Sequence, residues 1–196
     1  MSDLTRREAL GLFAGIPLVA AGLSPAQVSR ATLSARQAIA TATFTPAFFT
    51  ASELETVKIL ADLVIPRDTR SGSATDAGVP EFMDFILNEN SGMQTPFRGG
   101  LAWINTEARE RFGKEFTGIT EPQRKQILDD IAWPRKAKPE FSQGVAFFNR
   151  FRDLTASGFF SSKIGVADLQ YIGNEFVMEW KGCPPAALAK LGVSYS

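Results

Sequence analysis

The 196-residue sequence contains no histidine and one cysteine, and its 21 Lys and Arg residues are balanced by 21 Asp and Glu residues. Without histidine the chain cannot form a histidine-ligated haem or zinc site, a Ser-His-Asp triad or a histidine general base. A single cysteine excludes an internal disulfide, a cysteine-rich metal site and an iron–sulfur cluster. A neutral chain also lacks the basic excess by which nucleic-acid-binding proteins neutralise phosphates. The composition therefore argues against the commoner kinds of self-sufficient enzyme and against a nucleic-acid partner.

Cofactor-binding motifs are missing as well. The sequence has no GxGxxG dinucleotide fingerprint, no GxxxxGK[ST] phosphate loop and no GxSxG nucleophile elbow. Pairs of carboxylates could still hydrolyse glycosides. However, Asp129 and Asp130 are adjacent and diverge on a helix, and Glu81 and Asp84 lie in a first helical turn, where the dipole alone favours acids. We expect no catalytic, cofactor or metal residues, and a carboxylate-dependent hydrolase stays as the less favoured alternative.

The N-terminus resembles an export signal. Two arginines, Arg6 and Arg7, precede an apolar stretch over residues 10–23, which is 14 residues long and too short to span a bilayer as a helix. Paired arginines before a moderately apolar, glycine-containing stretch resemble the twin-arginine export signal. Thr5, Arg6, Arg7 and Leu10 match that pattern, whereas Ala9 and Gly11 depart from it. We therefore expect export through the twin-arginine route to the periplasm, with no membrane span in this chain.

Two small-x-small sites, at residues 38–40 and 40–42, are typical of signal-peptide cleavage. They predict a twin-arginine-type leader over residues 1–42 and one domain over residues 43–196. A cut near Ala26 is the alternative.

The remainder of the chain has the periodicity of helices, with apolar residues recurring three and four positions apart. The expected helices cover residues 52–64, 80–88, 95–112, 121–131, 141–160 and 186–191. Thr50 or Ser52 caps the first, and Thr120 with Gln123 forms a capping box for the fourth. Loops are expected over 67–78 and 90–95, and a linker over 133–139. The pattern predicts an all-α fold, a small irregular helical domain with long loops, whose core draws on the 16 phenylalanines.

Three stretches resemble the gluconate 2-dehydrogenase subunit 3 family. They run from FFT to IPRD (48–68), over AGVP and FMD (77–84), and from YIGN to WKGCP (171–184), and the likeness extends over residues 45–193. The resemblance implies a non-catalytic small subunit of a periplasmic FAD-dependent sugar or glycoside dehydrogenase. The large subunit, a glucose-methanol-choline type flavoprotein, would bind FAD and oxidise the sugar, and a cytochrome c subunit could accept the electrons. The small subunit would carry the export signal and support maturation and stability of the large one.

The C-terminal segment is the expected partner interface. An odd cysteine in an exported protein suggests an intermolecular disulfide or an exposed thiol, and a buried small apolar side chain is the other interpretation. Gly182 and Pro184 flank Cys183 and favour a loop. We predict that Tyr171, Trp180, Lys181 and Pro184 contact the large subunit and that Cys183 can form an intersubunit disulfide. A stand-alone periplasmic scaffold or binding protein remains the alternative function.

Overall fold

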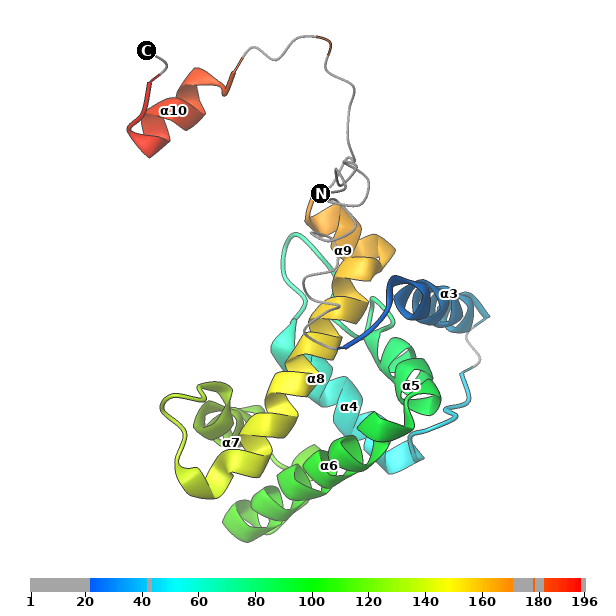
Figure 1. Cartoon of the computed structure of the whole chain (residues 1–196). Helices are drawn as coiled ribbons and strands as arrows, with labels where there is room; N and C mark the ends of the chain where they lie inside the picture. The colour runs from blue at the N-terminus through cyan, green and yellow to red at the C-terminus, as the bar shows by residue number, and fades with distance from the viewer. Residues whose placement is uncertain (1–21, 42–43, 171–177, 179–181, 195–196) are drawn as a thin grey trace, which may run out of the picture.

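The computed structural model describes residues 22–41, 44–170, 178 and 182–194, and every regular element among them is helical. Figure 1 shows their arrangement. The α-helices are α3 (Pro25–Thr41), α4 (Ala51–Val64), α5 (Val79–Glu89), α6 (Ser91–Phe112), α7 (Glu121–Ala132), α8 (Ser142–Ser161), α9 (Lys163–Asp168) and α10 (Pro185–Leu191). Short 3-10 helices cover Phe116–Gly118 and Pro139–Phe141. The predicted all-α class is confirmed.

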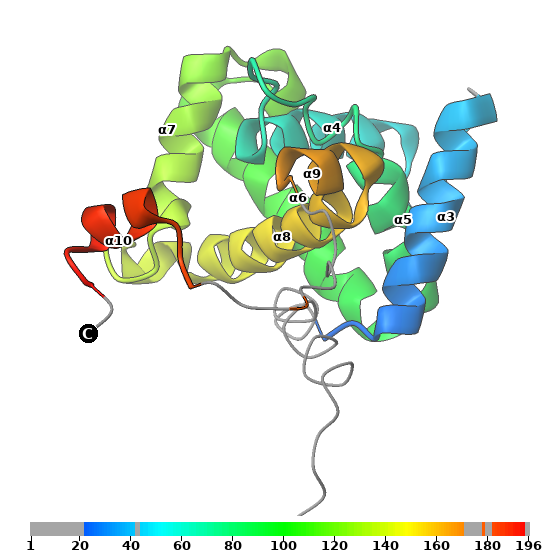
Figure 2. The same cartoon turned by 90° about the horizontal axis from the view of Figure 1, so that it is seen from above.

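Helix α8 is the centre of the domain, and it packs against α3, α4, α5, α6, α7 and α9 (Figure 2). Its phenylalanines supply much of the core, as the sequence predicts: Phe147, Phe148, Phe151 and Phe159 are all buried. Phe97 of α6 meets Phe147 edge to face, with ring centroids 5.7 Å apart. Aromatic pairs of this geometry add to the stability that burial alone provides.

Gly100 marks the closest approach of α6 to α8. A Cβ atom at this position would lie 2.0 Å from Cδ2 of Phe147 and 2.6 Å from its Cβ, whereas a Cβ at the adjacent Gly99 would meet nothing within 4 Å. Gly100→Ala should therefore lower the free energy of unfolding by about 2 kcal/mol through overpacking. Gly99→Ala should raise it by about 0.5–1 kcal/mol, because alanine is the better helix former. Urea unfolding of the two variants checks this, and equal effects at both positions would contradict the packing.

The predicted caps are present. Thr50 Oγ1 accepts from the Glu53 N–H at 3.2 Å, and Glu53 Oε2 accepts from the Thr50 N–H at 2.8 Å, which completes a capping box before α4. The Thr120 N–H donates to Gln123 Oε1 at 2.9 Å before α7. The predicted short helix near the C-terminus is confirmed as α10, which ends at Gly192 in the left-handed region.

One predicted helix boundary is wrong, and one helix was not predicted. Residues 91–95, expected as loop, are the first turns of α6, and Pro96 lies inside that helix. Proline removes the N–H that would bond to the carbonyl of Gly92, but Gly92 is exposed, so water can satisfy that group. Helix α9 has no counterpart in the sequence prediction. It has six residues, and Ser162 Oγ caps it by accepting from the Gly165 N–H at 3.0 Å.

Helix α3 lies within the segment that the sequence pattern assigns to the leader. Val28, Ala31 and Ala35 on one side of α3 are buried in the same core as α5 and α8. In Figures 1 and 2, α3 lies alongside α5 at the edge of the domain. The helical core of the structure therefore extends upstream of residue 43.

Candidate functional site

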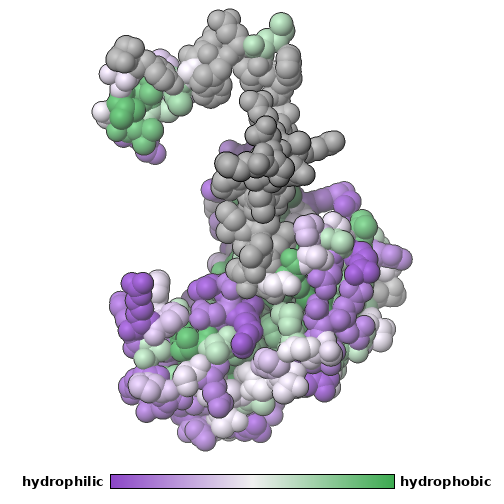
Figure 3. Space-filling view, viewed as in Figure 1, coloured by the Kyte–Doolittle hydropathy of each residue, from purple (hydrophilic) through white to green (hydrophobic). Residues whose placement is uncertain are grey.

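The C-terminal segment presents apolar side chains that the domain does not cover. None of the α10 residues is buried, Leu191 is 71% exposed and Val193 is 55% exposed. Figure 3 shows α10 as a mainly hydrophobic cluster apart from a largely polar body. A seven-residue helix is marginal in water without tertiary packing. We therefore expect this segment to pack against another surface.

Two of the predicted interface residues lie at the start of this segment. Pro184 is the N-cap residue of α10, and Cys183 is exposed beside it. The exposure of Cys183 agrees with the loop expected around it and contradicts the alternative that Cys183 is a buried small apolar side chain. Tyr171, Trp180 and Lys181 lie outside the described residues, as do Arg6, Arg7 and Leu10 of the predicted export signal. The intersubunit disulfide through Cys183 stays a prediction.

Asp84 holds the chain that leads into α4. The residue is 2% exposed, and its carboxylate accepts three backbone N–H bonds, from Ala47 at 2.8 Å, Phe48 at 3.0 Å and Phe49 at 2.9 Å. These donors precede the N-cap residue Thr50, so the side chain joins α5 to the start of α4. Both oxygens of Asp84 are thus engaged in structure.

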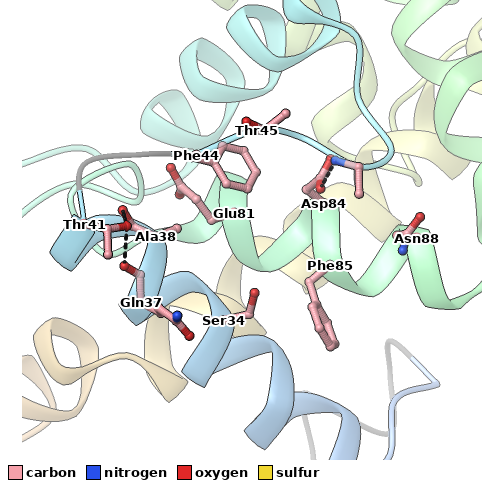
Figure 4. Close-up of a pocket in the computed structure, with 11 residues that line it drawn as sticks. Ser34, Gln37, Ala38, Thr41, Phe44, Thr45, Glu81, Asp84, Phe85 and Asn88 are labelled. Carbon is pink, nitrogen blue, oxygen red and sulfur yellow. Dashed lines mark hydrogen bonds between the residues drawn. The ribbon is translucent and has the colours of Figure 1, made fainter.

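A cavity of about 390 Å³ lies between α3, α5 and residues 44–47, as Figure 4 shows. Gln37, Thr41, Phe44, Glu81 and Asp84 are among its lining residues. Glu81 Oε2 is buried and has no hydrogen-bond partner among the described residues. Burial raises the pKa of the Glu81 carboxyl, and the charge of Asp84 adds to the rise, while the backbone N–H of Glu81 and the charge of Lys58 oppose it.

Because both Asp84 oxygens already accept backbone N–H bonds, the cavity does not offer the two accessible carboxyls that glycoside hydrolysis needs. The geometry of Glu81 and Asp84 therefore gives the hydrolase hypothesis no support.

The raised pKa of Glu81 predicts a pH-dependent loss of stability. A carboxyl whose pKa is higher in the folded than in the unfolded chain favours folding while it is protonated, and this contribution is lost as the pH rises through the folded pKa. Glu81→Gln should therefore be more stable than the native protein at pH 7, and the difference should shrink below pH 4.5, the ordinary pKa of this group. Thermal unfolding across this range, with the exposed Glu110→Gln as control, tests the assignment. A constant difference at all pH values would contradict it.

Asp130, one of the two adjacent acids on α7, is paired with a basic residue of α6. Arg111 bridges Glu107 at 2.7 Å and Asp130 at 2.6 Å, which ties α6 to α7. These side chains are partly exposed, so the ion pairs contribute little stability.

Within the described part of the chain, no group of three or more Asp, Glu or Cys side chains is placed to bind a metal ion. Among the described helices, none combines the length and the apolarity needed to cross a bilayer.

The sequence model of one protein family, gluconate 2-dehydrogenase subunit 3, matches residues 51–180, which is more than half of the chain. The match begins at α4 and ends just before the segment that contains Cys183 and α10, and it leaves α3 outside. No curated protein and no solved structure matches the chain.

Proposed function

The chain belongs to the gluconate 2-dehydrogenase subunit 3 family, and on this premise we propose that it is a non-catalytic small subunit that exports and stabilises an FAD-dependent sugar or glycoside dehydrogenase. The family match carries this proposal, because it assigns the chain to a subunit of a dehydrogenase complex. The large subunit would be a flavoprotein of the glucose-methanol-choline type, and a cytochrome c subunit could complete the complex. Substrate specificity would then belong to the large subunit.

The composition supports a division of labour between the subunits. A chain with no histidine, one cysteine and no dinucleotide fingerprint has few means to carry redox chemistry by itself. The apolar face of α10, exposed in the single chain, supplies a surface for a partner. We therefore place FAD on the partner subunit and the docking segment on this chain.

Export through the twin-arginine route would explain why the small subunit binds the flavoprotein before either crosses the membrane. This route carries proteins that are already folded, and FAD must be inserted where it is made. A flavoprotein loaded with FAD in the cytoplasm would cross as a folded passenger of the small subunit. The complex would then work in the periplasm.

Arg6→Lys with Arg7→Lys should trap both subunits in the cytoplasm, because the paired guanidinium groups are the recognition feature of the twin-arginine signal. Fractionation and immunoblotting of each subunit measure this. Arg36→Lys, an exposed conservative change on α3, is the control and should leave export unchanged. Normal export of the double variant would contradict the twin-arginine route.

Co-expression tests the accessory role directly. The flavoprotein subunit should lose solubility, export and activity when this chain is omitted. Equal yield and activity of the flavoprotein alone would contradict the proposal, whereas glycoside turnover by the purified small chain would favour the hydrolase alternative.

A further inference from the structure

Helix α3 packs against α5 in antiparallel orientation. Near the start of α3, Gln27 Nε2 donates to Asn90 Oδ1 at 3.4 Å and Arg30 pairs with Glu89 at 3.0 Å, and both partners lie at the C-terminal end of α5. Near the end of α3, Ile39 lies against Gly78, the N-cap residue of α5. The two helices are therefore in contact over the whole length of α5.

The contact is close enough to require small residues. Ala31 is fully buried and Ala35 is 3% exposed, and together with Val28 they form one face of α3 at three- and four-residue spacing. A Cβ on Gly78 would lie 2.7 Å from Ile39 Cδ1 and 3.4 Å from Ala35 Cβ, and the φ of +79° at Gly78 also favours glycine. A side chain added at Gly78 would thus push α3 away from α5.

Leu23, just before α3, belongs to the same core and is 5% exposed. A cut after residue 42 would remove Leu23 and all of α3, and a cut after residue 40 would leave only Thr41 of that helix; either would uncover the apolar side of α5 on which α3 lies. The bond after residue 40 lies within the last turn of α3, where Thr41 Oγ1 donates to the carbonyl of Gln37 at 3.0 Å, and a helical bond is a poorer protease substrate than an exposed extended segment. The alternative cut near Ala26 would still remove Leu23.

We propose that α3 and Leu23 are permanent parts of the folded domain and that the leader is cleaved after Gly22. Ala20 and Gly22 form a small-x-small pair directly before Leu23. The position of cleavage rests on the proposed export, whereas the role of α3 in the domain rests on its packing alone. The mature protein would begin at Leu23 and would retain a helix that the family match does not include.

Substitutions on α3 in the full chain test its place in the domain. Ala31→Asp puts a carboxylate into the α3–α5 contact and should lower the unfolding midpoint by about 10 °C or more. Val28→Ala is a milder variant that should still fold and lose about 3–6 °C. Ser29→Asp places the same charge on an exposed position of α3 and should shift the midpoint by less than about 2 °C. Midpoints within about 2 °C for all three variants would overturn the proposal.

The intact mass of the protein isolated from the periplasm tests the cleavage site. The expected mass is that of a chain beginning at Leu23, and a chain beginning at Thr41 or Thr43 would overturn the proposal. Retention of the uncleaved chain in the cytoplasm would instead overturn the proposed export, and the unfolding midpoints would then still decide whether α3 belongs to the domain.

Discussion

Asp84→Ala is expected to lower the free energy of unfolding by about 4 kcal/mol, a large part of the roughly 5–15 kcal/mol that holds a domain folded. The substitution leaves the N–H groups of Ala47, Phe48 and Phe49 without their acceptor, and Phe48 and Phe49 are buried. A buried donor that loses its partner costs about 1–3 kcal/mol. The effect is large because one side chain satisfies three donors.

Asp84→Asn should lower the free energy of unfolding by about half as much. The asparagine oxygen can still accept a backbone N–H bond, whereas the NH2 group that replaces the other oxygen is a donor and cannot. Asp68→Ala is the matched control. Asp68 also accepts two backbone bonds, from Arg70 and Ser71, but it is exposed and water can replace it. Thermal unfolding of the three variants measures the series. A midpoint for Asp84→Ala no lower than that for Asp68→Ala would contradict the assigned role.

Leu188→Asp combined with Leu191→Asp is expected to weaken binding of the flavoprotein subunit at least 30-fold, or about 2 kcal/mol. The two leucines are three residues apart and share one side of α10. A charge placed on an apolar docking face must be desolvated or must prevent contact. The unfolding midpoint of the isolated chain should hardly change, because α10 buries none of its residues.

Ala189→Asp supplies the control for this variant, since it adds a charge to the same helix away from the leucine face. Surface plasmon resonance with immobilised flavoprotein measures both affinities. An unchanged affinity of the double leucine variant would exclude α10 as the docking segment.

Local signals explain which helices could be predicted. α4, α5, α7, α8 and α10 follow from apolar spacing, caps and helix-ending glycine or proline. Pro96 conceals the start of α6, because a proline normally lies in the first turn of a helix. α9 is too short for a periodic pattern to stand out. In both cases packing against neighbouring helices, and not the local sequence pattern, determines that the segment is helical.

The roles of α3 and Asp84 depend on contacts between distant parts of the chain. The small residues that resemble a cleavage site, Ala38 and Ala40, follow the alanines that let α3 approach α5, and sequence alone does not separate these uses. The sequence pattern assigns Asp84 to a first helical turn, but the structure places only Glu81 there; Asp84 lies in the second turn of α5, and its partners lie 35 to 37 residues earlier. Local pattern does not reveal pairings of this kind.

The most direct test of the accessory-subunit account is to purify the natively produced protein under mild conditions and to record its visible absorption spectrum. The account predicts a larger chain in the preparation and the yellow absorbance of a bound flavin. A colourless chain that purifies alone would contradict it.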